Sequence, residues 1–165
     1  MSAKNARPLA QLLLVDPEQS RILLAYHKNG EFEGVYTALL DNVNEQEEPH
    51  DAAVRIALEL AGIHAQDLTL RAVLKFSSPA YETVDEYEYH SCNYHGTPRE
   101  GERVRPEWFA FDQIPYDQMP ADDAIWYPPF LEGRLQLGSF HFAADQQTLE
   151  HHSLEVVDSL DDIGS

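Results

Sequence analysis

The chain has 165 residues, of which 43% are hydrophobic and 24% are charged, and its formal net charge at pH 7 is −18. A chain of this size predicts a single domain, residues 1–165. So acidic a surface repels polyanions, which excludes DNA and RNA as partners. A small phosphorylated ligand could bind only with the help of a metal ion or of local cations. No apolar run is long enough to span a membrane, so we expect no membrane partner. The single cysteine, Cys92, fits a reducing compartment, and we therefore expect a cytoplasmic protein.

Apolar segments bounded by turn residues predict the strands in chain order. The first two are joined by the polar turn DPEQS (residues 16–20), which indicates a hairpin. A loop with two glycines and a short apolar run (residues 35–40) then lead toward the first helix. The first two expected strands are residues 9–15 and 22–26, and the later ones are residues 68–76, 81–94, 104–111, 135–143 and 148–157.

Residues 49–61 are predicted to form a helix, with Pro49 at its first position and Gly62 as the residue that ends it. Asp51, Arg55 and Glu59 recur every four residues and therefore form one charged stripe. A loop rich in glutamate before such a helix could hold a divalent metal and a phosphate. A buried helix with one solvated stripe explains the same residues.

Several prolines follow the strand 104–111, and a second helix is expected at residues 123–131. Strands on both sides of one central helix, with another helix late in the chain, predict an α+β fold, an α/β/α sandwich around a mixed sheet. We expect the core to span about residues 8–157 and residues 158–165 to form an acidic tail.

The order Glu47, Arg55, Glu59, Gly62, with seven, three and two residues between them, resembles the Nudix box, G-x5-E-x7-R-E-U-x-E-E-x-G-U. The segment RPEWFAFDQIPYDQMPADDAIWYPPFLEG (residues 105–133) resembles the corresponding part of MutT-type Nudix hydrolases of the animal type, the oxidised purine nucleoside triphosphatases. The similarity covers residues 9–157. It implies the Nudix fold, a mixed curved sheet between helices.

The resemblance also implies a Mg²⁺ site, because in this family the loop and helix hold Mg²⁺ against a diphosphate. Three helical glutamates gather the metal, and here their positions carry Ile56, Glu59 and Leu60. Glu59 and Glu47 are therefore the remaining candidates for catalytic and metal-binding roles. Glu47 is also expected to form the family's structural ion pair with Arg55, a role that needs no catalysis.

Two further positions depart from the family pattern. Asp41 stands in place of the first glycine of the box, where it adds bulk near the expected phosphates. A carboxylate that relatives carry just before the R-P-x-W strand falls on Arg103, although Glu102 is its neighbour. One helical carboxylate supplies too few ligands for two or three Mg²⁺ ions, so these changes predict loss of most of the metal site.

For the substrate, Asp122 and Asp123 match the paired aspartates that read a purine edge in this family. Asp122 is equally an N-cap candidate for the second helix. Pro120 replaces the tryptophan that stacks on the base, Thr37 stands where an asparagine binds the base, and His27 stands where a lysine lies.

These residues lead to three hypotheses. The first is a degenerate Nudix domain that has lost most or all hydrolysis and is retained for nucleotide binding or protein interaction. The second is an active Mg²⁺-dependent hydrolase of a nucleoside triphosphate or another nucleoside diphosphate derivative, with Glu45 or Glu102 adding ligands to Glu59 and Glu47. The third is a structural module, such as a homodimer, in which Ile56 and Leu60 are buried at an interface. Mg²⁺ is expected as a cofactor only if the protein is an active enzyme.

Overall fold

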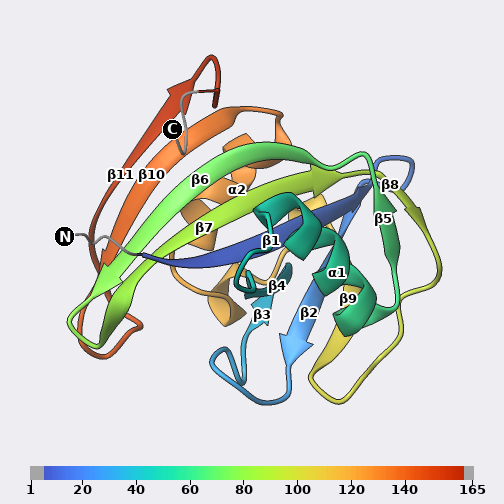
Figure 1. Cartoon of the computed structure of the whole chain (residues 1–165), viewed down its shortest axis with the longest axis horizontal. Helices are drawn as coiled ribbons and strands as arrows, with labels where there is room; N and C mark the ends of the chain where they lie inside the picture. The colour runs from blue at the N-terminus through green and yellow to red at the C-terminus, as the bar shows by residue number, and fades with distance from the viewer. Residues whose placement is uncertain (1–5, 162–165) are drawn as a thin grey trace.

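The computed structural model describes residues 6–161, which form a nine-stranded sheet, a two-stranded sheet and two α-helices (Figure 1). The helices are α1 (Pro49–Ala61) and α2 (Asp123–Leu131). The strands are β1 (Arg7–Asp16), β2 (Arg21–His27), β3 (Tyr36–Thr37), β4 (Leu39–Asn42), β5 (His64–Gln66), β6 (Thr69–Ser78), β7 (Tyr81–Ser91), β8 (Asn93–His95), β9 (Val104–Ala110), β10 (Leu135–Phe142) and β11 (Leu149–Val157). No helix within residues 6–161 is long and apolar enough to cross a membrane.

The large sheet is mixed. Its strand order is β11-β10-β6-β7-β1-β2-β3, with β4 also paired to β1 and β9 to β2. The β1–β7 and β6–β10 pairs are parallel, and the other pairs are antiparallel. The parallel β1–β7 pair brings the start of the chain beside residues more than seventy positions later, with Leu9 opposite Glu86 and Gln11 opposite Glu88.

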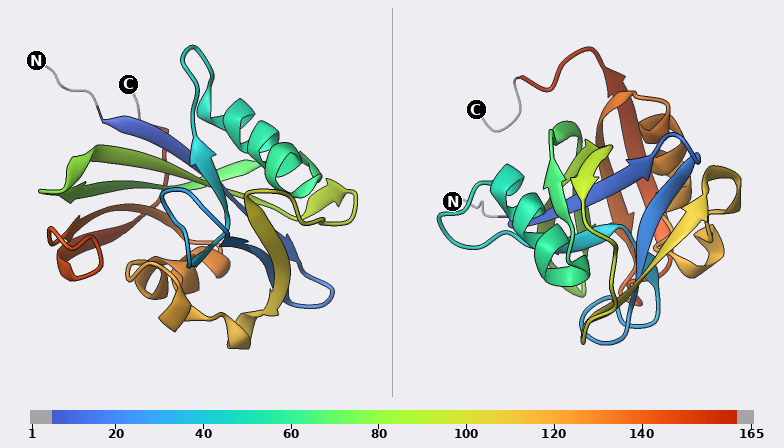
Figure 2. Two further views of the ribbon diagram at one scale, coloured as in Figure 1. Left: turned by 90° about the horizontal axis from the view of Figure 1, so that it is seen from below. Right: turned by 90° about the vertical axis from the view of Figure 1, so that its right-hand side faces the viewer.

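The central strand β1 is buried on both faces, because its side chains alternate between two apolar clusters. Leu9 and Leu13 belong to the cluster beneath α2, and Leu12 and Leu14 belong to the cluster beneath α1. In the left view of Figure 2, α1 lies on one side of the sheet and α2 on the other. This arrangement confirms the α/β/α sandwich expected from the sequence.

Helix α1 begins and ends where its sequence predicts. Pro49 occupies the first turn, and Gly62 takes the left-handed conformation with a φ of 72°. The Gly62 N–H donates to the carbonyl of Leu58 at 3.0 Å and the Ile63 N–H to that of Ala57 at 3.2 Å, which satisfies the end of the helix as a C-terminal cap should. Helix α2 also has the predicted bounds.

The structure differs from the expected strands at three places. The run 81–94 is not one strand, because β7 ends at Ser91 and the following residues form β8. Strand β8 pairs with β5 in the small sheet, and β5 was not expected from the sequence. The break is held locally, since the Ser91 hydroxyl donates to the carbonyl of Gln66 and accepts from the Asn93 N–H at 3.1 Å. The expected run 35–40 is divided between β3 and the start of β4, which continues to Asn42. In the acidic tail, residues 158–161 follow β11 without regular structure and residues 162–165 lie outside the described residues.

Candidate functional site

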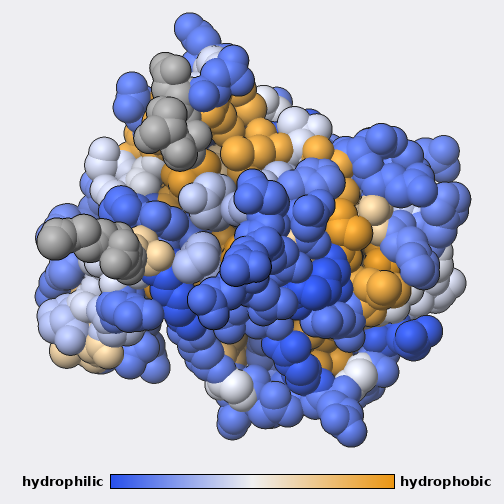
Figure 3. Space-filling model, in the orientation of Figure 1, coloured by the Kyte–Doolittle hydropathy of each residue, from blue (hydrophilic) through white to orange (hydrophobic). Residues whose placement is uncertain are grey.

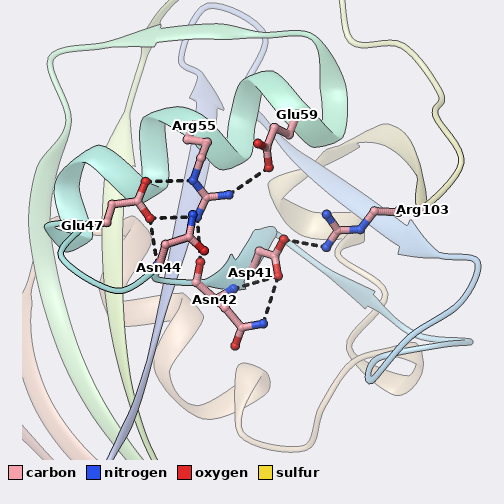
Figure 4. A network of polar contacts seen from close by, with 7 residues as sticks. All are labelled: Asp41, Asn42, Asn44, Glu47, Arg55, Glu59 and Arg103. Carbon is pink, nitrogen blue, oxygen red and sulfur yellow. Dashed lines mark hydrogen bonds and ion pairs between the residues drawn. The ribbon is translucent and has the colours of Figure 1, made fainter.

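Arg55 is the centre of the charged stripe on α1 (Figure 4). Its Nε and Nη2 atoms donate to the two carboxylate oxygens of Glu47 at 2.8 and 3.0 Å. Nη1 donates to Glu59 at 2.9 Å, and Nη2 also donates to the carbonyl of Asn42 at 2.8 Å. The bidentate pair lowers the pKa of Glu47 and raises that of Arg55, so both groups stay charged. The expected ion pair between Glu47 and Arg55 is present.

A second ion pair lies beside this one (Figure 4). Arg103, just before β9, donates from Nη2 to the carboxylate of Asp41 on β4 at 2.6 Å. A guanidinium therefore stands where the family resemblance places a metal-binding carboxylate. We call the two ion-paired groups together, Asp41, Glu47, Arg55, Glu59 and Arg103, the arginine–carboxylate network. Hydrophilic residues cover the middle of this face in Figure 3.

Ile56 and Leu60 point away from this network. They are 0% and 3% exposed and pack in the cluster between α1 and the sheet, together with Leu12 and Leu14. Leu58, on the opposite side of the helix, is 43% exposed. The burial of Ile56 and Leu60 is complete within the single chain, so the interface of the third hypothesis is not needed to cover them.

The donor set does not fit a Mg²⁺ cluster. Within residues 6–161, no three aspartate, glutamate, histidine or cysteine side chains converge closely enough to hold a metal ion. Each of Asp41, Glu47 and Glu59 already accepts a hydrogen bond from an arginine. Mg²⁺ needs near-octahedral oxygen ligands, and an adjacent guanidinium opposes any cation electrostatically.

We therefore expect no Mg²⁺ to bind on the Glu59 face at millimolar concentration. Isothermal titration calorimetry of the protein with MgCl₂ should show no saturable site. Arg103→Gln, which removes the competing guanidinium without adding a carboxylate, should still show none, because the missing ligands are not restored. An octahedral ion coordinated by Glu59 in a crystal soaked in MgCl₂ would refute this prediction.

The second part of the site is a cavity of about 730 Å³ beside α2, which we call the α2 cavity. This volume is in the range of small-molecule sites. Asp122 and Asp123 line it at the start of α2, and Leu9, Gln11 and Thr37 line it from the sheet. The structure thus brings Thr37 and the paired aspartates to one cavity, as the resemblance implies.

Asp122 does not act as the predicted N-cap. Its backbone is already helical, with φ −72° and ψ −24°, and its side chain makes no capping hydrogen bond. Instead its carboxylate accepts from Nε1 of the fully buried Trp126 at 2.9 Å. Burial raises the pKa of Asp122, and that of Asp123 is raised well above its usual value by burial and by the adjacent Asp122 carboxylate.

Three residues behind the aspartates were missed by the sequence analysis. Gln11 Nε2 donates to Glu86 at 3.1 Å and to Glu88 at 2.7 Å, and Gln11 Oε1 accepts from the N–H of Ala38 at 3.0 Å. Burial raises the pKa of Glu86 to about 7 and that of Glu88 well above its usual range. One signal was available, because Glu86 and Glu88 alternate with tyrosines and must share the face of β7 that carries Val84.

His27 lies behind Thr37. The Thr37 hydroxyl donates to the carbonyl of Ala38 at 2.6 Å, so it accepts from His27 Nε2 at 2.7 Å. Burial and the nearby Arg103 lower the pKa of His27 to about 4, which keeps its ring neutral at pH 7. Thr37 lines the α2 cavity and His27 is not among its lining residues, so His27 orients Thr37 from behind.

No protein-family model matches the chain. The chain is 35% identical over 158 residues to the oxidized purine nucleoside triphosphate hydrolase of Mus musculus, covering 94% of this chain and 98% of that protein. Its fold is similar to a MutT protein from Bacillus halodurans (TM-score 0.77, 18% identity, 90% of this chain and 97% of the other) and to a MutT NUDIX hydrolase from Burkholderia pseudomallei (TM-score 0.62, 27% identity, 68% and 88%).

Proposed function

Since the chain belongs to the Nudix family of MutT-type hydrolases, we propose that it binds a purine nucleotide while its Mg²⁺-dependent pyrophosphohydrolase activity is lost or much weakened. One observation carries this proposal. Where the family's helical carboxylates would gather the metal, Ile56 and Leu60 are buried in the core and Glu59 is paired with Arg55. The residues of the phosphate end therefore form ion pairs among themselves.

The α2 cavity supports the binding half of the proposal. Asp122 and Asp123 remain buried at its wall, with exposures of 3% and 4%. Pro120, which also lines the cavity, supplies no aromatic face, and the loss of base stacking costs about 1–3 kcal/mol, or about one to two powers of ten in affinity. Arg103 is half exposed and paired with Asp41, so a phosphate group would compete with that carboxylate for the guanidinium.

A titration of nucleotides tests the proposal. We expect GMP to bind weakly and no worse than GTP or an oxidised guanine nucleotide, because the triphosphate gains no metal contact. NMR chemical shifts of the tryptophan and backbone amides near Asp123 should report the binding, with and without MgCl₂. Triphosphate binding that depends on Mg²⁺ and is much tighter than monophosphate binding would contradict the proposal and support an active enzyme.

The active hydrolase stays the second candidate, and its support is the 35% identity with the mouse hydrolase over 94% of the chain. It requires Glu59, which is half exposed on α1, to leave Arg55 and bind a metal. A panel of nucleoside triphosphates and diphosphate derivatives with Mg²⁺ and with Mn²⁺ decides between the two. Turnover that disappears in Glu59→Gln but persists in Glu48→Gln, an exposed glutamate just before the same helix, would establish the hydrolase. Background rates in all three proteins are the result we expect.

A further inference from the structure

The α2 cavity is lined by more carboxyl groups than the recognition of a neutral purine requires. Resting on the proposed function, we propose that this cavity selects a base carrying a positive charge, such as an N-alkylated purine, and that Glu86 is the residue that makes this selection. The base-reading role carried by the family resemblance falls on Asp122 and Asp123. Glu86 is a third carboxyl in the same cavity, contributed by β7.

The lining of the cavity is strongly acidic. Among the described residues that line it, seven are aspartate or glutamate and one, Arg7, is basic. Arg7 donates to Glu31 at 2.7 Å and to Asn42 at 3.2 Å, so its charge is already compensated at the rim. The exposed carboxylates Glu33, Asp117 and Asp145 give this lining a negative potential, which favours a cation and disfavours an anion.

Few donors serve the buried carboxyls. Glu86, Asp122 and Asp123 are 7%, 3% and 4% exposed. Gln11 donates to Glu86 at 3.1 Å, and the indole N–H of Trp126 donates to Asp122 at 2.9 Å and also serves the Asp123 carboxyl. Burying three carboxyls beside so few donors is costly, and an occupant with N–H groups or positive charge lowers that cost.

The arrangement around Gln11 determines which glutamate can ionise. Glu88 is 0% exposed, whereas Glu86 lines the cavity. Both accept from the same Gln11 amide, and burial raises the pKa of each, so the pair shares a proton. Glu86 is therefore the member of the pair that can present a carboxylate to a ligand.

The charged groups around Glu86 come from three other parts of the chain. Asp122 at the start of α2 and Glu31 in the loop after β2 raise its pKa, and Arg7 on β1 lowers it. A cationic ligand would add a nearby positive charge and so lower the pKa of Glu86 below 7, which makes binding and ionisation mutually favourable. A neutral ligand has no such effect.

The walls of the cavity also suit a delocalised cation. Phe32, Phe76, Tyr81 and Phe142 line it, so four aromatic rings border the cavity although Pro120 has none. Burial and nearby carboxylates raise the pKa of Tyr81 to about 12, so its ring keeps a neutral hydroxyl. A cation over an aromatic face gains about 0.5–2 kcal/mol, more when it is desolvated.

The test compares two isomers of the same size. One is 1-methyladenosine 5′-monophosphate, whose ring is cationic between pH 6 and 7.5, and the other is N6-methyladenosine 5′-monophosphate, whose ring is neutral. We expect the cationic isomer to bind at least tenfold more tightly at pH 7.5 by calorimetry. Its affinity should rise about eightfold from pH 6 to 7.5, because the ionised fraction of a group with a pKa of about 7 rises by that factor. The affinity of the neutral isomer should stay flat or fall.

Variants then assign the effect to one side chain. Glu86→Gln should remove the pH dependence and most of the preference for the cation, whereas Glu82→Gln, at an exposed glutamate of the same strand that does not line the cavity, should keep both. If Glu86→Gln does not fold, the two isomers on the unaltered protein still decide. Equal affinity for the isomers, or tighter binding at low pH, overturns the inference while purine binding stands. Binding of neither isomer, nor of GMP, would instead refute the proposed nucleotide-binding function.

Discussion

Replacing both Ile56 and Leu60 by glutamate is expected to unfold the protein. The two side chains are 0% and 3% exposed in the apolar cluster between α1 and the sheet. An uncompensated buried carboxylate costs about 3–5 kcal/mol, and two of them approach the whole stability of a typical domain, about 5–15 kcal/mol. Urea denaturation of the two single variants and the double variant, followed by tryptophan fluorescence, measures the loss.

The control for this experiment lies on the same helix. Leu58 is 43% exposed, so Leu58→Glu should change the free energy of unfolding by no more than about 0.5 kcal/mol. A double variant that keeps its melting temperature would show that positions 56 and 60 reach solvent. Mg²⁺-dependent hydrolysis in that variant would further show that this scaffold lacks only its metal ligands.

The stability of the protein is expected to fall as the pH rises from 6.5 to 9. Burial raises the pKa values of Glu86, Glu88, Asp122 and Asp123 in the folded state. A carboxyl that stays protonated when folded but ionises when unfolded stabilises the fold below its unfolded pKa, and this contribution disappears as the pH rises through the folded pKa. Each such group lowers the free energy of unfolding by about 1.4 kcal/mol per pH unit between its unfolded and its folded pKa. Glu86 therefore contributes only up to about pH 7, and the fall above that pH comes from Glu88 and Asp123, whose pKa values are raised well above the usual range.

Two histidines act in the opposite direction, but only at lower pH. Burial lowers the pKa of His27 and of His90 to about 4, from an ordinary value of 6.5. Their neutral burial stabilises the fold above pH 6.5, and this contribution is lost as the pH falls from 6.5 toward 4. Below pH 6.5 the histidines therefore oppose the effect of the carboxyls on stability, and above pH 6.5 they do not. The range from pH 6.5 to 9 is for this reason the one in which the effect of the carboxyls can be measured.

Thermal melts between pH 6.5 and 9 measure this dependence. Glu88→Gln, which keeps the hydrogen bond to Gln11 but cannot ionise, should give a clearly flatter profile than the unaltered protein. Glu82→Gln, at an exposed position of the same strand, should leave the slope unchanged. If the melting temperature of the unaltered protein rises across this window, the buried carboxyls are not held protonated.

The amino-acid sequence by itself determined the local structure and the family. Pro49 and Gly62 fix both ends of α1 because each has a backbone preference that suits only that position, φ near −65° for the proline and the left-handed region for Gly62. Alternation of apolar residues located most strands, since the period of two is a property of the extended chain itself. That positions 56 and 60 carry the aliphatic residues Ile56 and Leu60 was readable directly, because it is a matter of residue identity.

Only the tertiary structure decided what the polar residues do. Arg103 meets Asp41 across 62 positions, and Gln11 meets Glu86 and Glu88 across 75 and 77. No local rule brings such residues together, because the pairing of β1 with β7 and the course of the chain before β9 are set by burial of the whole sheet. Asp122 shows the same limit at short range, since its helix start suggested a cap but the burial of Trp126 required an acceptor for the indole N–H. Residue identity and local period are encoded in neighbouring positions, whereas the partner of a buried polar group depends on which distant segments the core brings into contact.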